Sequence, residues 1–418
     1  MADGITRIAV EGFKSISKRQ SIDIAPLTIL AGANSSGKSS IMQPLLMLKQ
    51  TLESTFDPGP LLINGGHVKF TSSEQFLSKD TLSKSAKRLS LEIVVAPSHE
   101  FRIAFTKDSK SSLAVAEETV VLNGAASTLR PDMTSDEIRQ VIEKVFRIGK
   151  IPDFEYAVVR NRFFLFARTK EGVQSTLMEW IGPIVEGLIH VPGLRGNRER
   201  TYPVAALGPD FPSTFEYYVA SVIEDWQSKG NPLSAALNND LKHLNLAESV
   251  VARRLTEVEI DLQVSRLRGR KNDMVSIADV GLGVVHTLPV LVALRVADVG
   301  RLVYIEQPEI HLHPRAQVKL ADILADAAKH GVRVVAETHS TLLLTAIQTL
   351  VAKGELRPEL VKLHWFQRDP KTGVTEVSST DLDENGAFAQ SDWPEDFDDV
   401  ILKADGAYLD AVEGRQVR

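Results

Sequence analysis

The chain has 418 residues, 43% of them hydrophobic, and a formal net charge of −6. This length is enough for one large core or for two to three lobes that share one. The acidic balance gives no global attraction to polyanions, so contact with nucleic acid would need a local basic patch. The sequence has no cysteine, which excludes disulfides, thiolate nucleophiles and cysteine-ligated zinc.

The first residues do not have the pattern of a signal peptide. The charged residues Asp3, Arg7, Glu11 and Lys14 interrupt any apolar core in this stretch. We also find no run of about 18 uncharged apolar residues, the length that a membrane-spanning helix needs. We therefore expect a cytoplasmic protein with no membrane contact.

In chain order, the first predicted unit is a strand, a loop and a helix. The run from Ile22 to Ala31 is predicted to be a strand, and a Gly/Ser/Asn loop follows it. The next stretch has helical periodicity, with its apolar positions at Ile41, Leu45, Leu46, Leu48 and Leu52.

The middle of the chain is predicted to form an arm and a lobe. Residues 89–166 contain short alternating segments such as LEIVVA and FRIAF, which predict an antiparallel sheet with one helix near 136–146. We expect this sheet to be an inserted arm. Residues 176–270 are predicted to be mostly helical and to end in the basic, strand-like piece RLRGRK.

The last part of the chain alternates between strands and helices. Strands are predicted at RLVYIE, VRVVAE and VKLHWFQ, and helices at 314–329 and 341–351. This alternation is typical of a largely parallel sheet with helices on its faces, so the fold class is α/β.

The loop after the first strand has the sequence of a phosphate-binding loop. It satisfies G-x-x-x-x-G-K-[ST] between a predicted strand and a predicted helix, the context that the motif requires. In such a loop backbone N–H groups bind the β-phosphate, Lys38 offsets β/γ charge and the Ser39 hydroxyl binds Mg²⁺. A Gly/Ser turn that only caps a helix is the alternative. The predicted nucleotide-binding residues are Gly32, Asn34, Ser35, Ser36, Gly37, Lys38, Ser39 and Ser40.

Two later strands end in residues suited to the same chemistry. The strand LVYIE ends in Glu306, a carboxylate that next to the phosphate loop would hold Mg²⁺ directly or through water. His339 follows the strand VRVVAE and would hydrogen-bond a γ-phosphate or the attacking water. Taken alone, each of these two residues is an ordinary polar residue after a strand. The phosphate loop elsewhere in the sequence is what favours a functional role for them.

The segment DVGLGVVHTLPVLVALR places Gly281 and Gly283 ahead of a long apolar helix. Glycines at this position form a nest of N–H groups that is able to bind phosphate. Two spaced glycines are weak evidence by themselves.

Together these motifs resemble the ABC-type heads of the SMC, RecF and overcoming-lysogenization-defect (OLD) ATPases. They resemble more closely the stand-alone predicted AAA-family ATPases of bacteria, which are often found in anti-phage defence loci. The resemblance begins at IAVEGFKSI and continues through GANSSGKSS, DVGLGV, YIEQPEIHLHP and AETHS, with a weaker match at VPGLRGNRERTYP and in the tail LDENGAFAQSDWPEDFDD.

This resemblance implies a role for each motif. Gly281 and Gly283 would stand at the ABC signature, which acts on the partner's γ-phosphate across a dimer. Glu306 would be the Walker B carboxylate, residues 311–314 the D-loop region and His339 the switch histidine. The implied cofactors are ATP and Mg²⁺.

One residue departs from the family pattern. Most ABC heads carry a catalytic Glu directly after the Walker B carboxylate, whereas this chain has Gln307. An amide can orient water but cannot act as a general base at neutral pH. Hydrolysis would then depend on Glu309, on His339 or on the phosphate itself.

The resemblance also divides the chain. Residues 1–85 and 271–380 are expected to form the ATPase core, 86–270 the arm and helical lobe, and 381–418 a C-terminal segment. Gln75 is the best candidate for the Mg²⁺-binding Q-loop glutamine, and an ordinary surface glutamine is an equal alternative.

The charged clusters are weaker candidates for a functional role. The first basic cluster would contact phosphate or an interface, and the second basic cluster would contact DNA. Solvated charge is nevertheless the commoner outcome for such runs. The acidic residues near the C-terminus have the pattern of a solvated tail. The first basic group is Arg195, Arg198 and Arg200, the second is Arg266, Arg268, Arg270 and Lys271, and the acids are Asp381, Asp383, Glu384, Asp392, Glu395, Asp396, Asp398 and Asp399.

The preferred hypothesis is a slowly hydrolysing ATPase that closes as a homodimer around two ATP molecules and works as a switch with a protein effector in anti-phage defence. One rival is an ATP-clamped scaffold that barely hydrolyses, which Gln307 favours. The other is an ATPase of DNA repair or associated with a nuclease. No Toprim-like acidic pattern follows His339 and no long coiled coil is predicted, which disfavours a self-contained nuclease.

Overall fold

The structure is a computed structural model, and it describes most of the chain. The described residues are 4–78, 88–95, 99–107, 113–122, 124–146, 154–172, 174–175, 180–195, 200–266 and 273–389.

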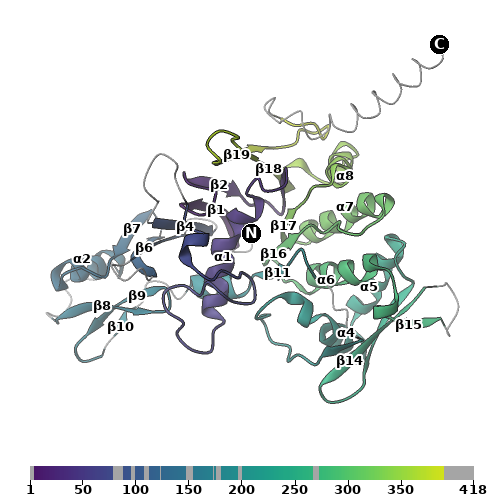
Figure 1. The fold of residues 1–418 in the computed structure, drawn as a ribbon, viewed down its shortest axis with the longest axis horizontal. Coiled ribbons are helices and arrows are strands. Elements are labelled where there is room, and N and C mark those ends of the chain that lie inside the picture. Colours follow the sequence, from purple (N-terminus) through teal and green to yellow (C-terminus); the bar gives the residue numbers. More distant parts are fainter. Residues whose placement is uncertain are drawn as a thin grey trace, which may run out of the picture.

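A six-stranded, mostly parallel sheet lies at the centre of the fold (Figure 1). Its first five strands are parallel, and the last pairs antiparallel with its neighbour. In spatial order they are β11 (Ile189–Val191), β16 (Leu302–Glu306), β17 (Arg333–Glu337), β3 (Leu27–Gly32), β18 (Val361–Arg368) and β19 (Thr375–Thr380).

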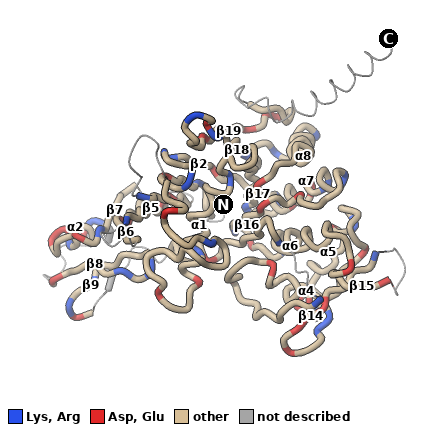
Figure 2. Tube along the Cα trace, in the orientation of Figure 1, with Lys and Arg blue, Asp and Glu red and all other residues tan. Residues whose placement is uncertain are grey.

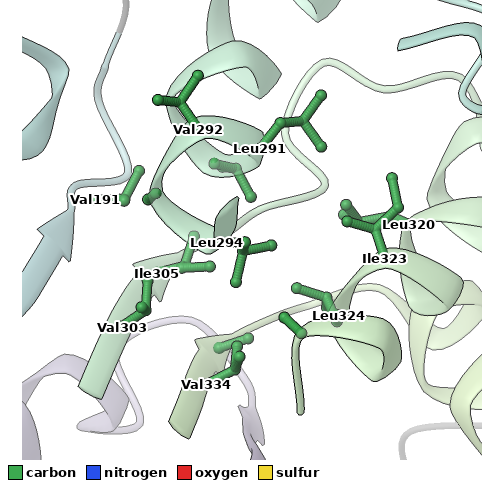
Figure 3. Close-up of a cluster of buried hydrophobic side chains, with 14 of the residues drawn as sticks. Val191, Leu291, Val292, Leu294, Val303, Ile305, Leu320, Ile323, Leu324 and Val334 are labelled. Atoms are coloured by element: carbon green, nitrogen blue, oxygen red, sulfur yellow. The ribbon is translucent and has the colours of Figure 1, made fainter. Parts of the chain in front are cut away.

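Alternate residues of these strands contribute to two different cores, because successive side chains of a strand point to opposite faces. Val303 and Ile305 of β16 pack with the helices on one face, a cluster drawn in Figure 3. Leu302 and Tyr304 belong to the second core, on the other face. Burial on both faces explains why these strands are continuous apolar runs.

Helices cover both faces of this sheet. α6 (Leu282–Val296), α7 (Pro314–Lys329) and α8 (Thr341–Ala352) contribute to the first core. α1 (Lys38–Leu52) and the short α3 (Ile181–Glu186) contribute to the second. The sequence prediction for α7 is confirmed to the residue, with Pro314 at the first helical position and the His313 side chain accepting from the backbone N–H of Arg315.

A second six-stranded sheet, antiparallel throughout, packs with α1. β1 pairs with β4, so residues on both sides of the boundary expected at 86 share this sheet. Its strands are, in order, β2 (Gln20–Asp23), β1 (Ile5–Glu11), β4 (Arg88–Val95), β5 (His99–Lys107), β6 (Leu113–Leu122) and β7 (Ala125–Leu129).

Two smaller units complete the described part. The first contains α2 (Ser135–Phe146) and the strands β10 (Gln174–Ser175), β9 (Phe164–Thr169) and β8 (Tyr156–Asn161). The second contains α4 (Val219–Ser228), α5 (Pro232–His243) and the strands β12 (Thr201–Pro203), β14 (Glu259–Ser265), β13 (Ser249–Arg254) and β15 (Met274–Ser276). Short 3₁₀ helices are η1 (Ser73–Gln75), η2 (Phe215–Tyr217), η3 (Ile277–Asp279) and η4 (Pro358–Leu360).

Two sequence predictions need correction. The single strand expected from Ile22 to Ala31 is two strands of different sheets, β2 and β3, and Pro26 stands in the break between them. The mostly helical stretch expected at 176–270 also contains β11 to β14. Strands such as β11 are short and lack a clear period, so their sheet partners, not local pattern, determine them. Within the described residues, no helix is both long and apolar enough to cross a membrane.

Candidate functional site

The phosphate-binding loop lies between the end of β3 and the start of α1. Gly32 and Gly37 have φ angles of 142° and 104°, a region that residues with a Cβ rarely adopt. A Cβ on Gly32 would also lie 2.3 Å from the carbonyl oxygen of Phe366. Both glycines of the motif are therefore required by the backbone, independently of any ligand.

The loop borders a cavity of about 980 Å³, within the range of roughly 300–1,000 Å³ usual for ligand sites. Segments distant in sequence converge on it, among them the turn after β1 and the hairpin between β18 and β19. The lining residues include Lys14, Ser15, Ser17, Asn34, Ser35, Ser36, Gly37, Lys38, Ser39, Ser40, Gln43, Gln75, Gln307, Glu337, His339, Arg368, Thr372, Gly373 and Val374.

Lys38 is 5% exposed, and its ammonium folds over the loop. Nζ donates to the carbonyl oxygens of Gly32 at 2.9 Å and Ala33 at 2.8 Å. Burial lowers the pKa of Lys38, an effect that the nearby carboxylates of Glu337 and Glu309 oppose. An ammonium has three donors, so one remains for a phosphate oxygen.

Ser39 contacts a carboxylate that the sequence analysis did not single out. Its hydroxyl donates to Oε2 of Glu337 at 2.8 Å, and the Tyr304 hydroxyl donates to Oε1 of the same residue. Burial, followed by the charge of Glu306, raises the pKa of Glu337 to about 7. The available signal was its position as the last residue of the strand VRVVAE.

Glu306 is the last residue of the neighbouring strand β16, and its carboxylate oxygens contact groups that do not line the cavity. Oε1 lies 3.2 Å from Nε2 of His190, and Oε2 accepts from the backbone N–H of Gly193 at 3.0 Å. Burial alone would raise the pKa of Glu306, but the contact with His190 and the Gly193 hydrogen bond outweigh it and lower the pKa. Glu306 is not among the residues that line the cavity.

A buried polar chain runs behind Glu306. Nδ1 of His190 lies 3.0 Å from Nδ1 of His67, whose Nε2 lies 3.1 Å from Oε2 of Glu53. Glu53 also pairs with Lys49 at 2.8 Å. These contacts join the end of β16 to the C-terminal end of α1, so the orientation of Glu306 depends on residues far from the cavity.

Gln307 and Glu309, close together in the same turn, face different surroundings. Gln307 lines the cavity with a φ of 45°, and its N–H donates to the carbonyl oxygen of Glu337 at 2.9 Å. Glu309 is 8% exposed, and its Oε1 accepts from the Thr338 hydroxyl at 2.7 Å and from the N–H of His339 at 3.0 Å. Glu309 thus supports the loop of His339 and does not line the cavity.

His339 and Gln75 both reach the cavity. Burial, followed by the charge of Lys38, lowers the pKa of His339, so its imidazole is neutral at pH 7 and keeps one acceptor nitrogen. The Gln75 carbonyl oxygen accepts from the N–H of Thr71 at 2.8 Å, within the segment that holds η1.

Gly281 and Gly283 are outside the cavity of their own chain. Gly281 precedes α6 with an ordinary φ of −63°, and a Cβ there would meet nothing within 4 Å. Leu282, between the two glycines, is 45% exposed. The N-terminus of α6 is therefore an open surface.

The structure assigns Arg195 to the interior and not to a phosphate or an interface. The residue is 3% exposed and donates to four carbonyl oxygens at 2.6–3.0 Å. Burial lowers its pKa to about 10. The four acceptors belong to His286, Pro192, Glu306 and Gln307.

Four other described members of the charged clusters are in contacts within the chain, and Glu384 is exposed. Arg200 pairs with Asp279, Arg266 with Asp273 and Asp381 with Lys362, and Asp383 accepts backbone N–H groups of its own turn. The remaining basic residues of the two clusters, and the acids from Asp392 onward, are outside the described residues.

The residues of the cavity fit a nucleotide with Mg²⁺. A hydroxyl, a carboxylate and an amide carbonyl are oxygen ligands of the kind that Mg²⁺ prefers, and Mg²⁺ commonly binds one or two carboxylates together with substrate phosphates. Among the described residues, no group of three or more His, Asp or Glu forms a metal site of its own. Mg²⁺ binding here would thus depend on phosphate oxygens.

A family model described as "AAA domain, putative AbiEii toxin, Type IV TA system" matches residues 27–345. The chain belongs to this family. No curated protein is similar enough in sequence to count as a match.

Solved SMC heads are similar in fold. An SMC head crystallised with the C-terminal winged-helix domain of ScpA gives a TM-score of 0.50 at 12% identity, covering 91% of this chain and 98% of that one. The heads from Thermotoga maritima and Pyrococcus furiosus give 0.41 and 0.45, at 12% and 11% identity, covering 90% and 91% of this chain and 98% and 97% of theirs. The first match shows that the chain has the ABC-type P-loop ATPase fold of SMC heads.

The contacts of Arg195 lead to a stability prediction. We expect Arg195→Met to lower the free energy of unfolding by at least about 3 kcal/mol, because a single hydrogen bond from a charged donor contributes about 1.5–3 kcal/mol and four carbonyls lose theirs. Urea unfolding followed by circular dichroism measures this change. Arg200→Met is the control, since its exposed ion pair is worth only about 0–1 kcal/mol. Equal losses in both variants would contradict the assigned role.

Proposed function

We propose that the chain binds ATP with Mg²⁺ in this cavity, hydrolyses it slowly and works as a nucleotide-driven switch. The observation that carries the proposal is the convergence, on one cavity, of the phosphate-binding loop with Ser39, Gln307 and His339. The loop and Ser39 lie where β3 gives way to α1, and the other two residues follow β16 and β17, so the convergence is a property of the sheet.

Each group has a distinct task in this proposal. The loop N–H groups and Lys38 bind the β- and γ-phosphates. Mg²⁺, held with the help of Ser39, would neutralise charge on the phosphates. Gln307 orients the attacking water by hydrogen bonding, and His339 contacts the γ-phosphate or that water. Because Gln307 accepts no proton at neutral pH, hydrolysis is expected to be slow.

We also propose that two copies of the chain complete each other's sites. Gly281 and Gly283 lie at an exposed helix N-terminus, where N–H groups and the helix dipole favour a phosphate. They do not line the cavity of their own chain. A two-fold dimer would place each signature segment against the partner's ATP and bury both sites together. The core of residues 1–85 and 271–380 would provide this interface, and the arm and lobe of 86–270 would carry the response.

A protein effector, in anti-phage defence, is the partner that we propose. The description of the family names a toxin of a type IV toxin–antitoxin system, which supports a role beside a second protein. DNA has less support, because Lys and Arg are interspersed with Asp and Glu along the described trace (Figure 2). The second candidate function is an ATP-clamped scaffold, which Gln307 favours.

The nucleotide site itself is tested by Lys38→Ala. We expect ATP affinity to fall by at least about tenfold, since hydrogen bonds to charged groups contribute about 1.5–3 kcal/mol and 1.4 kcal/mol is a factor of ten. Isothermal titration measures the affinity. Lys353→Ala is the control, because Lys353 follows the end of α8, far from His339. Wild-type affinity in Lys38→Ala would refute the site.

The dimer is tested by Gly281→Arg. The monomer accommodates the side chain, since nothing lies within 4 Å of the new Cβ, so folding and ATP binding should persist. ATP-dependent pairing should be lost because the arginine would occupy the position of the partner's phosphate. Light scattering with and without ATP measures the pairing. The matched control is Gly208→Arg. Gly208 lies next to Asp210, which pairs with Arg301 just ahead of β16. The control position is therefore at the opposite end of β16 from Gln307. Normal pairing in Gly281→Arg would count against the signature role.

Gln307→Glu separates the switch from the scaffold. A positioned general base typically contributes about 10²- to 10⁴-fold, so a scaffold that lacks one should gain about a hundredfold or more. A competent ATPase should gain little, and we expect this result. Single-turnover hydrolysis decides, with Glu309→Gln and His339→Ala measured beside it. A hundredfold gain would favour the scaffold.

A further inference from the structure

Two carboxylates end neighbouring strands at the phosphate-binding edge of the sheet. Glu306 of β16 and Glu337 of β17 are partners in the parallel ladder. Paired residues of neighbouring strands project to the same face, so both side chains lie on the face that α1 covers. Only Glu337 makes a hydrogen bond with Ser39, at 2.8 Å.

Glu337 is held where a metal ion on Ser39 would meet it. It is 3% exposed, lines the cavity, and has its second oxygen fixed by the Tyr304 hydroxyl. Among the described residues it forms no ion pair with a Lys or Arg. A buried carboxylate without a paired cation is costly, and a bound divalent cation would remove that cost.

Glu306 is oriented in a different way. Its two oxygens are occupied by His190 and by the N–H of Gly193, and the chain through His67 to Glu53 fixes His190 in turn. This arrangement keeps the carboxylate beside the cavity without lining it.

Resting on the ATP·Mg²⁺ function proposed above, we infer that Glu337, and not Glu306, is the carboxylate that shares Mg²⁺ with Ser39. Glu306 is then a positioning residue, which adds negative charge behind Glu337. The metal-site carboxylate of this chain comes from the strand that precedes His339, so metal binding and the loop of His339 are coupled through two consecutive peptide units.

The test compares Glu337→Gln with Glu306→Gln, two isosteric changes in the full-length protein. The quantity is the magnesium enhancement, the ratio of the ATP Kd measured in EDTA to that measured in MgCl₂, from titration with a fluorescent ATP analogue. Changes in groups around a metal typically cost about 10- to 100-fold in metal affinity. We expect Glu337→Gln to reduce the enhancement by about tenfold or more, Ser39→Ala to reduce it similarly, and the double variant to lose no more than either one.

Glu306→Gln should change the enhancement by less than about threefold, whatever it does to turnover. Thermal unfolding without nucleotide checks that each variant is folded. If Glu337→Gln does not fold, Glu306→Gln beside Ser39→Ala still decides: an equal loss in these two overturns the inference, and a retained enhancement in Glu306→Gln supports it. Loss in Glu306→Gln alone, or equal loss in both carboxylate variants, also overturns it. If the wild-type protein binds no ATP in either buffer, the proposed function fails instead.

Discussion

The strands β3, β17 and β16 pair in parallel, so all three end at one edge of the central sheet. The candidate site is built at this edge from the last residues of the three strands and from the loops that follow them. Gly32 begins the phosphate-binding loop at this edge, and Glu337 and Glu306 are the last residues of the other two strands. Because the register pairs Glu306 with Glu337 and Glu337 with Leu30, these groups cannot move independently. A shift of one residue in either pairing would turn a carboxylate to the opposite face.

Polar contacts in the interior maintain this edge of the sheet, at a cost in free energy from buried charge and a strained backbone. Arg195 is buried, and it binds the carbonyl oxygens of the turn that begins at Glu306. Gln307 keeps a φ of 45°, a conformation that costs about 1–3 kcal/mol outside glycine and persists only where neighbours enforce it. The N–H of Gln307 donates to the carbonyl oxygen of Glu337, and Arg195 donates to the carbonyl oxygen of Gln307. These two hydrogen bonds hold Gln307 in this conformation. The structure therefore stores strain at a residue that lines the cavity.

The two cores lie on opposite faces of the central sheet and are formed by different elements. α1 carries the loop lysine at its start and packs against the antiparallel sheet, while α6 to α8 pack on the opposite face. The N-terminus of α6 is open at the surface, although the body of that helix is buried. The packed side chains of α6 therefore connect the exposed segment at Gly281 with the central sheet.

Local sequence was sufficient for the elements whose signal is a short motif or a clear period. The phosphate-binding loop, the strands β16, β17 and β18 and the helix at Pro314–Lys329 were predictable, because glycine spacing, apolar runs and capping residues act over a few positions. The tertiary structure alone decided the partner of Ser39, the interior position of Arg195, the approach of Gln75 to the cavity, and the division of the run at 22–31 between two sheets. Each of these depends on contacts between segments far apart in the chain, such as the 298 positions that separate Ser39 from Glu337. Periodicity reports which face of an element is buried, but it does not report which neighbour buries it.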